Sequence, residues 1–145
     1  QGILTQYSYV QAGQNPVKIL LHFNHPISHI TWTLQDSDGK YYPIEKAKIQ
    51  FGEACTDMID GESLRFIKPY NNGFKIPDDE QYIYSYNFSL EMHSEHPSGM
   101  LDFAKMEPVL YLRGNEIGDK NVTIYGHIRN VLTTENGHHD IKVKL

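Results

Sequence analysis

The feature that most constrains the fold is an alternation of side-chain type in residues 82–92, which read YIYSYNFSLEM. One set of alternate positions is entirely aromatic or aliphatic and consists of Tyr82, Tyr84, Tyr86, Phe88, Leu90 and Met92. The other set is mostly polar and includes Ser85, Asn87 and Glu91. Because successive side chains of a β-strand point to opposite faces, this pattern predicts a strand with one face in a hydrophobic core.

The same period of two recurs along the chain. Residues 17–24, 30–35 and 47–51 alternate in this way, and three further runs, 108–113, 122–128 and 139–145, also read as strands. Turn-forming residues such as Asp38-Gly39 separate the runs. Only residues 55–67 allow another interpretation, either a short helix or a long loop. Short strands with half-polar faces predict an all-β fold, in which two antiparallel sheets pack as a sandwich.

Length and charge limit the classes of function. A chain of 145 residues suits a single domain with one core. The formal net charge is −5, and acidic and basic residues are interspersed, without the basic stripe that is typical of nucleic-acid-binding proteins. No apolar run approaches the roughly 20 residues of a membrane helix. We therefore expect neither direct nucleic-acid contact nor membrane insertion.

The residue patterns favour neither an enzyme nor a metalloprotein. None of the eight histidines has the spacing of a ligand set, and Cys55 is the only cysteine. The acidic run at 36–45 lacks the ligand spacing of a calcium loop, and a β-turn accounts for it. No phosphate-binding loop or nucleophile elbow occurs. We expect no catalytic residues, no metal and no cofactor, and we treat the glycosylation sequons at Asn87 and Asn121 as unoccupied.

Several short motifs follow one another in a fixed order. An Asn-His-Pro turn precedes a strand with a tryptophan, a Pro-Tyr element follows, and the aromatic strand at 82–92 leads to Pro-Ser-Gly and then to a phenylalanine. The motif residues are Asn24, His25, Pro26, Trp32, Pro69, Tyr70, Pro97, Ser98, Gly99 and Phe103. In this order the sequence resembles the C-terminal jelly roll of the double jelly-roll major capsid protein of nucleocytoplasmic large DNA viruses. The resemblance covers about residues 16–145; it departs from the family at Met100-Leu101 and in a more charged final strand.

The resemblance implies an antiparallel jelly-roll β-sandwich of about eight strands, with at most one short helix near 55–67. Residues 16–145 are then a single jelly-roll domain, and residues 1–15 are an N-terminal lead-in or linker segment. The family's N-terminal jelly roll has no counterpart in this sequence. A fragment of a longer double jelly-roll protein and a single-roll relative therefore both remain open.

The function implied by the resemblance is structural and not enzymatic. In the family, a homotrimer forms a pseudo-hexagonal capsomer, and capsomers tile an icosahedral virion shell that is assembled in the host cytoplasm. The partners implied are further copies of the chain, neighbouring capsomers and minor capsid proteins. For contacts between subunits we single out the loop aromatics Tyr41, Tyr42 and Tyr70, because aromatic residues are enriched at interfaces. The alternative is that these tyrosines cover the ends of the sandwich.

The Pro-Ser-Gly motif at 97–99 is expected to form a corner between the two sheets. Pro97 fixes φ near −65° and ends a strand ladder, Ser98 can bond to nearby backbone, and Gly99 can adopt a positive φ. We therefore interpret this motif as architectural.

Other functions share the predicted fold class. A related viral scaffold protein, as in poxviruses, or a minor or penton capsid protein would differ in its state of assembly. A carbohydrate-binding sandwich would stack sugars on Trp32 or on loop tyrosines, although the mid-strand position of Trp32 favours the core. A cupin-like metalloenzyme would need three convergent histidines and a carboxylate, which the spacing does not offer.

Overall fold

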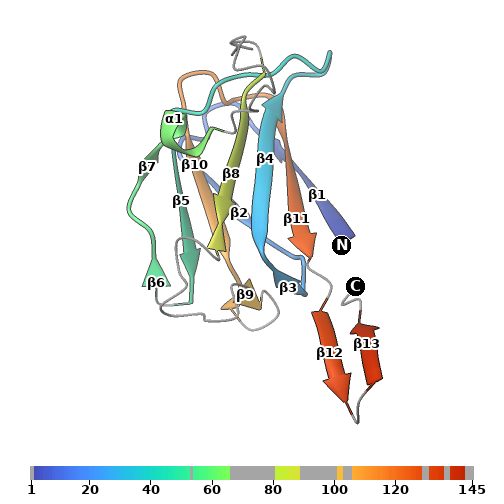
Figure 1. Cartoon of the computed structure of the whole chain (residues 1–145). Helices are drawn as coiled ribbons and strands as arrows, with labels where there is room; N and C mark the ends of the chain where they lie inside the picture. The colour runs from blue at the N-terminus through green and yellow to red at the C-terminus, as the bar shows by residue number, and fades with distance from the viewer. Residues whose placement is uncertain are drawn as a thin grey trace, which may run out of the picture.

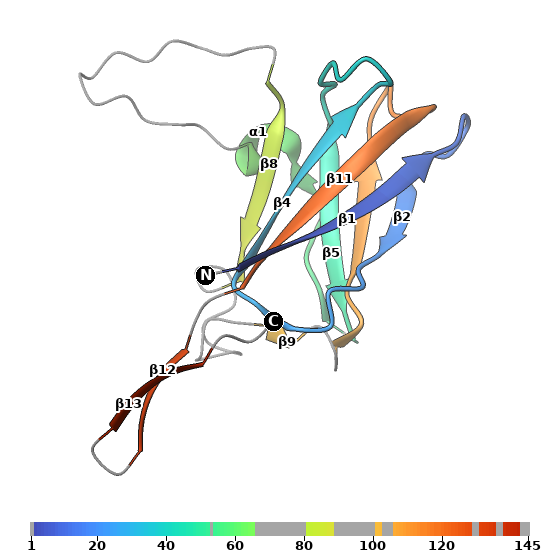
Figure 2. The same ribbon diagram turned by 90° about the vertical axis from the view of Figure 1, so that its right-hand side faces the viewer.

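Two antiparallel sheets pack face to face in the computed structural model, which describes residues 2–52, 54–65, 81–88, 101–102, 106–128, 131–135 and 138–142 (Figures 1 and 2). The first sheet has the order β1 (Gly2–Val10), β11 (Lys120–Ile128), β4 (His29–Gln35) and β8 (Ile83–Asn87). The second has the order β2 (Val17–Leu20), β10 (Val109–Arg113), β5 (Lys46–Phe51) and β6 (Ala54–Cys55), and β7 (Ile59–Asp60) also pairs with β5. The predicted antiparallel β-sandwich is confirmed.

The pairing order shows how the chain is wound. β1 pairs with β11, β2 with β10, β4 with β8, and β5 with β6 and β7. Each of these pairs lies inside the previous one along the sequence, as in one long two-stranded ribbon. The ribbon is rolled up, because β11 also pairs with β4 and β10 also pairs with β5. A rolled antiparallel ribbon of this kind is a jelly roll.

Four short elements and one helix complete the described structure. The helix α1 (Gly61–Leu64) falls within residues 55–67, where the sequence allowed one short helix. β3 (Pro26–Ile27) pairs with β9 (Leu101–Asp102). β12 (Val131–Glu135) and β13 (His138–Lys142) pair with each other as a separate two-stranded sheet. The strand expected at 139–145 is thus found in part as β13, outside the two main sheets.

The N-terminal segment differs from its expected role as a lead-in. Gly2–Val10 forms a nine-residue strand that pairs with β11 along its whole length. Val10 is fully buried in the core. Sequence periodicity did not indicate this strand because its polar Gln6 and Ser8 face inward, while Ile3, Tyr7 and Tyr9 are exposed.

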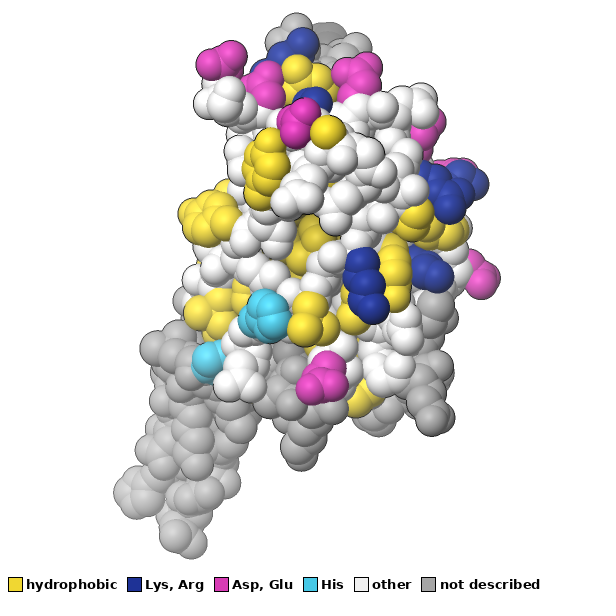
Figure 3. Space-filling view, turned by 180° about the vertical axis from the view of Figure 1, so that it is seen from behind, with side chains coloured by type: hydrophobic (Ala, Val, Ile, Leu, Met, Phe, Trp, Pro, Cys, Tyr) yellow, Lys and Arg dark blue, Asp and Glu magenta, His cyan; other side chains and the backbone are white. Residues whose placement is uncertain are grey.

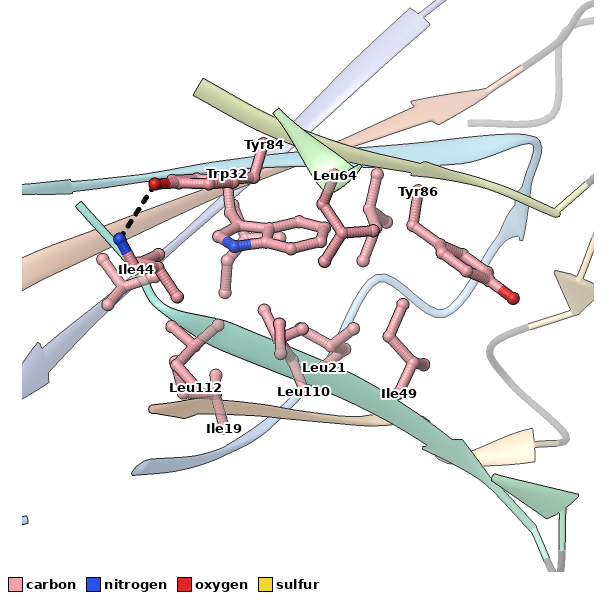
Figure 4. Packing of buried hydrophobic residues seen from close by; sticks show 14 of the residues in the cluster. Ile19, Leu21, Trp32, Ile44, Ile49, Leu64, Tyr84, Tyr86, Leu110 and Leu112 are labelled. Atoms are coloured by element: carbon pink, nitrogen blue, oxygen red, sulfur yellow. Dashed lines mark hydrogen bonds between the residues drawn. The ribbon is translucent and has the colours of Figure 1, made fainter. Parts of the chain in front are cut away.

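The core lies between the sheets and is built from the predicted inward faces. It contains alternate residues of the aromatic strand β8 together with Trp32 of β4 on one side and aliphatic residues of β5 and β10 on the other (Figure 4). Trp32 and Tyr84 are opposite each other in the β4–β8 register, and their ring centroids lie 6.2 Å apart. The backbone N–H of Ile44 donates a hydrogen bond of 2.9 Å to the Tyr84 hydroxyl (Figure 4). None of the helices in the described part of the chain has the length and apolar character needed to cross a membrane.

Candidate interaction surface

The Asn-His-Pro motif forms the connection from β2 in the second sheet to β4 in the first. Asn24 has a φ of 58°, in the left-handed region that asparagine tolerates better than most residues. The Nδ1 atom of His25 lies 2.7 Å from the carbonyl oxygen of Phe23, and Pro26 begins β3. These residues thus lie in the connection before the Trp32 strand, where the sequence predicts a turn, and their architectural role stays a prediction.

Trp32 is fully buried, as the sequence favoured. Its indole Nε1 donates no hydrogen bond within the described residues. A ring in the centre of the core is inaccessible to a ligand. Trp32 therefore cannot serve as a platform for a sugar.

Two of the tyrosines singled out as contact candidates are half-buried. The Tyr42 hydroxyl donates a 3.0 Å hydrogen bond to Oδ2 of Asp36, which raises the pKa of Tyr42, and Nζ of Lys120 lies 4.2 Å from the ring centroid. Tyr41 forms a β-bridge with Gln35. The side chain of Tyr42 is thus engaged within its own chain, at one end of the sandwich.

The remaining motif residues, Pro69, Tyr70, Pro97, Ser98, Gly99 and Phe103, lie outside the described residues. The short strand β9 follows residues 97–99 directly and pairs with β3 outside the two main sheets. Of the main-sheet strands, β8 before this region is in the first sheet and β10 after it is in the second. The chain therefore crosses between sheets somewhere from 88 to 108. That the crossing is made at Pro-Ser-Gly stays a prediction.

The exposed large hydrophobic side chains of the described residues gather on β1 and β2. They are Ile3 (60% exposed), Tyr7 (76%), Tyr9 (58%) and Leu20 (45%). β1 and β2 are edge strands of the two sheets and lie on the same side of the sandwich (Figure 2). An open groove runs between them, and its lining includes Gln6, Tyr7, Tyr9, Lys18, Leu20 and His22. Exposed apolar side chains that gather in one region mark candidate interaction sites.

Gln6 connects the two edges across this groove. Its side-chain Nε2 donates a 2.8 Å hydrogen bond to the Leu20 carbonyl, and its Oε1 accepts a 2.8 Å hydrogen bond from the His22 N–H. Both backbone groups lie at the outer edge of the second sheet. The inward-facing amide on β1 thus links the edges of the two sheets.

The outward-facing paired positions of the first sheet carry no charged residue, and we call this surface the neutral face. The carboxylate of Asp119 borders it, where it accepts a 3.1 Å hydrogen bond from the Tyr9 hydroxyl. From β1 to β8 the register aligns outward residues in rows: Ile3 with His127, His29 and Asn87; Thr5 with Tyr125, Thr31 and Ser85; Tyr7 with Thr123, Thr33 and Ile83; and Tyr9 with Asn121 and Gln35. None of these positions is Lys, Arg, Asp or Glu. Depletion of charge is a mark of the buried centre of protein interfaces.

Two histidines lie side by side on the neutral face. The rings of His29 on β4 and His127 on β11 are stacked, with centroids 3.9 Å apart. His127 Nε2 is 3.1 Å from the Thr31 hydroxyl, and His29 Nδ1 is 3.0 Å from the Ser28 hydroxyl. Partial burial, together with the neighbouring His29, lowers the pKa of His127. Among the residues with described side chains, no group of three or more His, Cys, Asp or Glu could hold a metal ion.

The outer face of the second sheet has the opposite character, and we call it the basic face. Lys18 on β2, Lys46 and Lys48 on β5 and Arg113 on β10 share this side of the sheet. Tyr111 lies between Lys18 and Lys48 in the register, and Lys48 Nζ is 4.8 Å from its ring centroid. Figure 3 looks onto this side of the molecule, with Lys and Arg side chains beside hydrophobic ones across its middle. The sequence shows no basic stripe because these residues come from three separate strands.

Comparison with known proteins shows similarity of fold. No protein-family model and no curated protein sequence matches the chain. The chain aligns with VP54 of PBCV-1, in a crystal structure fitted into a cryo-EM reconstruction of the virophage Sputnik, with a TM-score of 0.63 and 15% identity. It also aligns with a chain of a quasi-atomic model of the PBCV-1 virus capsid, with a TM-score of 0.61 and 17% identity. Both alignments cover 96% of this chain and 49% of the other, so the chain spans about half the length of these structures.

Proposed function

We propose that this chain is a structural protein of a viral capsid and forms one jelly-roll unit of a major capsid protein of a large DNA virus. The observation that carries the proposal is the fold shared with a chain of the PBCV-1 capsid over 96% of this chain. The nested strand pairing and the order of the sequence motifs support it. Its role is architectural, without catalysis or a cofactor.

The finer features of the proposal follow the family that the sequence resembles. The chain assembles with copies of itself into trimeric, pseudo-hexagonal capsomers of an icosahedral shell, in the cytoplasm of the host, and minor capsid proteins join them. Tyr41, Tyr42 and Tyr70 remain proposed contact residues. The domain includes β1, since this strand supplies Val10 to the core.

The mass of the native complex tests this function. Native mass spectrometry and negative-stain electron microscopy of the purified protein are expected to show trimers or shells, and the denatured chain gives the mass of one subunit. A particle that stays at the 16.7 kDa of a single chain at every concentration would contradict the proposal.

One observation favours a second candidate, a carbohydrate-binding module. Tyr7 and Tyr9 are exposed beside the groove between β1 and β2, where a sugar ring can stack on an aromatic side chain. A glycan array tests this function directly. Binding that is lost in Tyr7→Ala and Tyr9→Ala, while the fold is retained, would favour this candidate over the capsid role.

A further inference from the structure

The two outer faces of the sandwich differ in how well each can pack against the same face of a second copy of the chain. In a twofold contact the same patch of each subunit faces its counterpart, and residue i of one copy contacts residue j of the other and j contacts i. On a patch whose charges are mostly of one sign, the charges that meet are therefore mostly like charges. Such juxtaposed like charges cost several kcal/mol. The basic face carries Lys18, Lys48 and Arg113, and it also carries Lys46, whose Nζ lies 3.6 Å from an Asp60 carboxylate oxygen. It therefore repels itself.

The neutral face carries no such penalty. It carries hydroxyl, amide, imidazole and tyrosine side chains, which both donate and accept hydrogen bonds. Thr33 and Thr123 are buried, so the groups that can pair with copies of themselves are the more exposed ones, such as Thr5 and Asn121. Its β1 edge adds the exposed Ile3, Tyr7 and Tyr9, which supply apolar area. A surface that is uncharged, self-complementary in hydrogen bonding and apolar at one edge fits a second copy of the same surface.

We propose that the neutral face docks face to face onto the neutral face of a second copy of this chain. This inference rests on the proposed capsid function and names the surface through which one assembly contact is made. A contact of a surface with itself has twofold symmetry, whereas contacts around a threefold axis join different patches. In the proposed arrangement this contact therefore joins chains of two neighbouring trimers.

The size of the face sets the strength that the contact can have. Four strands spaced about 4.8 Å apart and about seven residues long cover roughly 400 Å² per copy in projection. Two such faces bury an area at the low end of specific interfaces, which is typical of weak or transient association. The contact is therefore reversible at low protein concentration and gains strength from multiple copies in a shell. It also requires that Asn87 and Asn121, both on this face, carry no glycan.

A charge placed in the neutral face tests the proposal. Thr5 is exposed on β1 and lies in the row with Tyr125, Thr31 and Ser85. Thr5→Glu places an unpaired carboxylate of each copy in the face-to-face contact, where its burial is costly wherever the twofold axis lies. Sedimentation velocity over a range of concentrations is expected to show at least a tenfold weaker association of trimers with one another, or of monomers into dimers, than in the unchanged chain. Circular dichroism verifies that the variant is folded.

The matched control places the same charge on the other sheet. Val109→Glu changes a half-buried, outward-facing residue of β10 on the basic face. It is expected to leave this association unchanged. Equal weakening in both variants would overturn the assignment of the contact to the neutral face.

A mixture of opposite charges identifies the partner surface. Thr5→Lys is expected to self-associate as poorly as Thr5→Glu, and an equimolar mixture of the two is expected to recover association.

The two proposals fail in different ways. If the unchanged chain forms trimers and larger particles, and Thr5→Glu forms them equally well, the docking inference is wrong and the capsid function stands. If the unchanged chain forms only dimers that Thr5→Glu abolishes, the neutral face is a self-docking surface and the trimeric capsid function is wrong.

Discussion

Among single residues, Tyr84 has the most specific role in the core. Its side chain is 1% exposed, and its hydroxyl accepts the hydrogen bond from the Ile44 N–H. Tyr84→Phe leaves that buried N–H without its partner, so we expect the free energy of unfolding to fall by about 1–3 kcal/mol. Urea denaturation measures the change. The control is Tyr111→Phe, which removes a hydroxyl bonded to Gln50 in a half-buried position, and a loss no larger than in this control would contradict the role given to Tyr84.

The stacked histidines predict a dependence of stability on pH. Burial and the neighbouring His29 lower the pKa of His127 below its ordinary value of 6.5. The unfolded chain therefore binds a proton more readily than the folded chain, so stability is full above pH 6.5 and declines as the pH falls below this value. Around this ring the described neighbours on the sheet are Ile3, His29, Thr31 and Tyr125, none of which is an acid.

The measurement is the free energy of unfolding between about pH 8 and pH 5, the range in which histidine titrates. His127→Asn is expected to reduce the slope in this window. His22→Asn, which changes an exposed histidine at the β1–β2 edge, serves as the control and is expected to leave the slope unchanged. An identical slope in His127→Asn and the unchanged chain would rule out His127 as the titrating group.

At the scale of elements, the strands were predictable where their inward faces are apolar. Alternation placed Val17 and Ile19 of β2, and Tyr84 and Tyr86 of β8, on buried faces, and all four are buried. β1 does not follow this rule, because its inward side includes the polar Gln6 and Ser8 while Ile3, Tyr7 and Tyr9 are exposed. Its alternation therefore contains no signal of an apolar inner face.

The role of β1 can be tested through its last residue. Val10 is fully buried, and Val10→Ala removes two methyl groups from the core. We expect a loss of about 2 kcal/mol in the free energy of unfolding. Tyr7→Ala, on the exposed side of the same strand, is expected to change stability by less than about 0.5 kcal/mol. If residues 2–10 were only a lead-in segment without structural contacts, Val10→Ala and Tyr7→Ala would change the free energy of unfolding equally little.

β11 contains a glycine where the β2–β3 connection packs against it. A Cβ atom at Gly126 would lie 3.0 Å from ring atoms of Phe23 and 3.1 Å from Cδ1 of Ile27. Gly126→Ala overpacks this contact, and we expect it to cost about 1–3 kcal/mol of stability. Phe23→Leu in the same chain removes ring atoms and is expected to relieve part of that cost. If the two substitutions change the free energy of unfolding additively in a double-mutant cycle, Gly126 and Phe23 are not coupled and overpacking of this contact is not the cause.

At the scale of the whole molecule, the candidate surfaces arise from residues that the sequence keeps apart. Lys18, Lys48 and Arg113 meet on the basic face only after three strands have paired. The neutral face likewise depends on the register of β1, β11, β4 and β8. The sequence therefore predicted the fold class and the buried position of Trp32. For contacts between subunits the sequence indicates loop tyrosines, because these can be recognised without knowledge of the strand order.

The nested pairing affects how the chain folds during its synthesis on the ribosome. Among the described strands β1 is synthesised first, yet its partner β11 ends at residue 128 and is made more than a hundred residues later. Local hairpins such as β5 with β6 can form early, whereas β1 stays without its partner until β11 has been synthesised. During that wait the nascent chain presents an unpaired edge that carries Ile3, Tyr7 and Tyr9, the kind of segment that chaperones hold and that aggregates recruit. Because non-local pairing of this kind slows folding, yield in a host cell should depend on the pace of translation and on chaperone supply as well as on the stability of the finished roll.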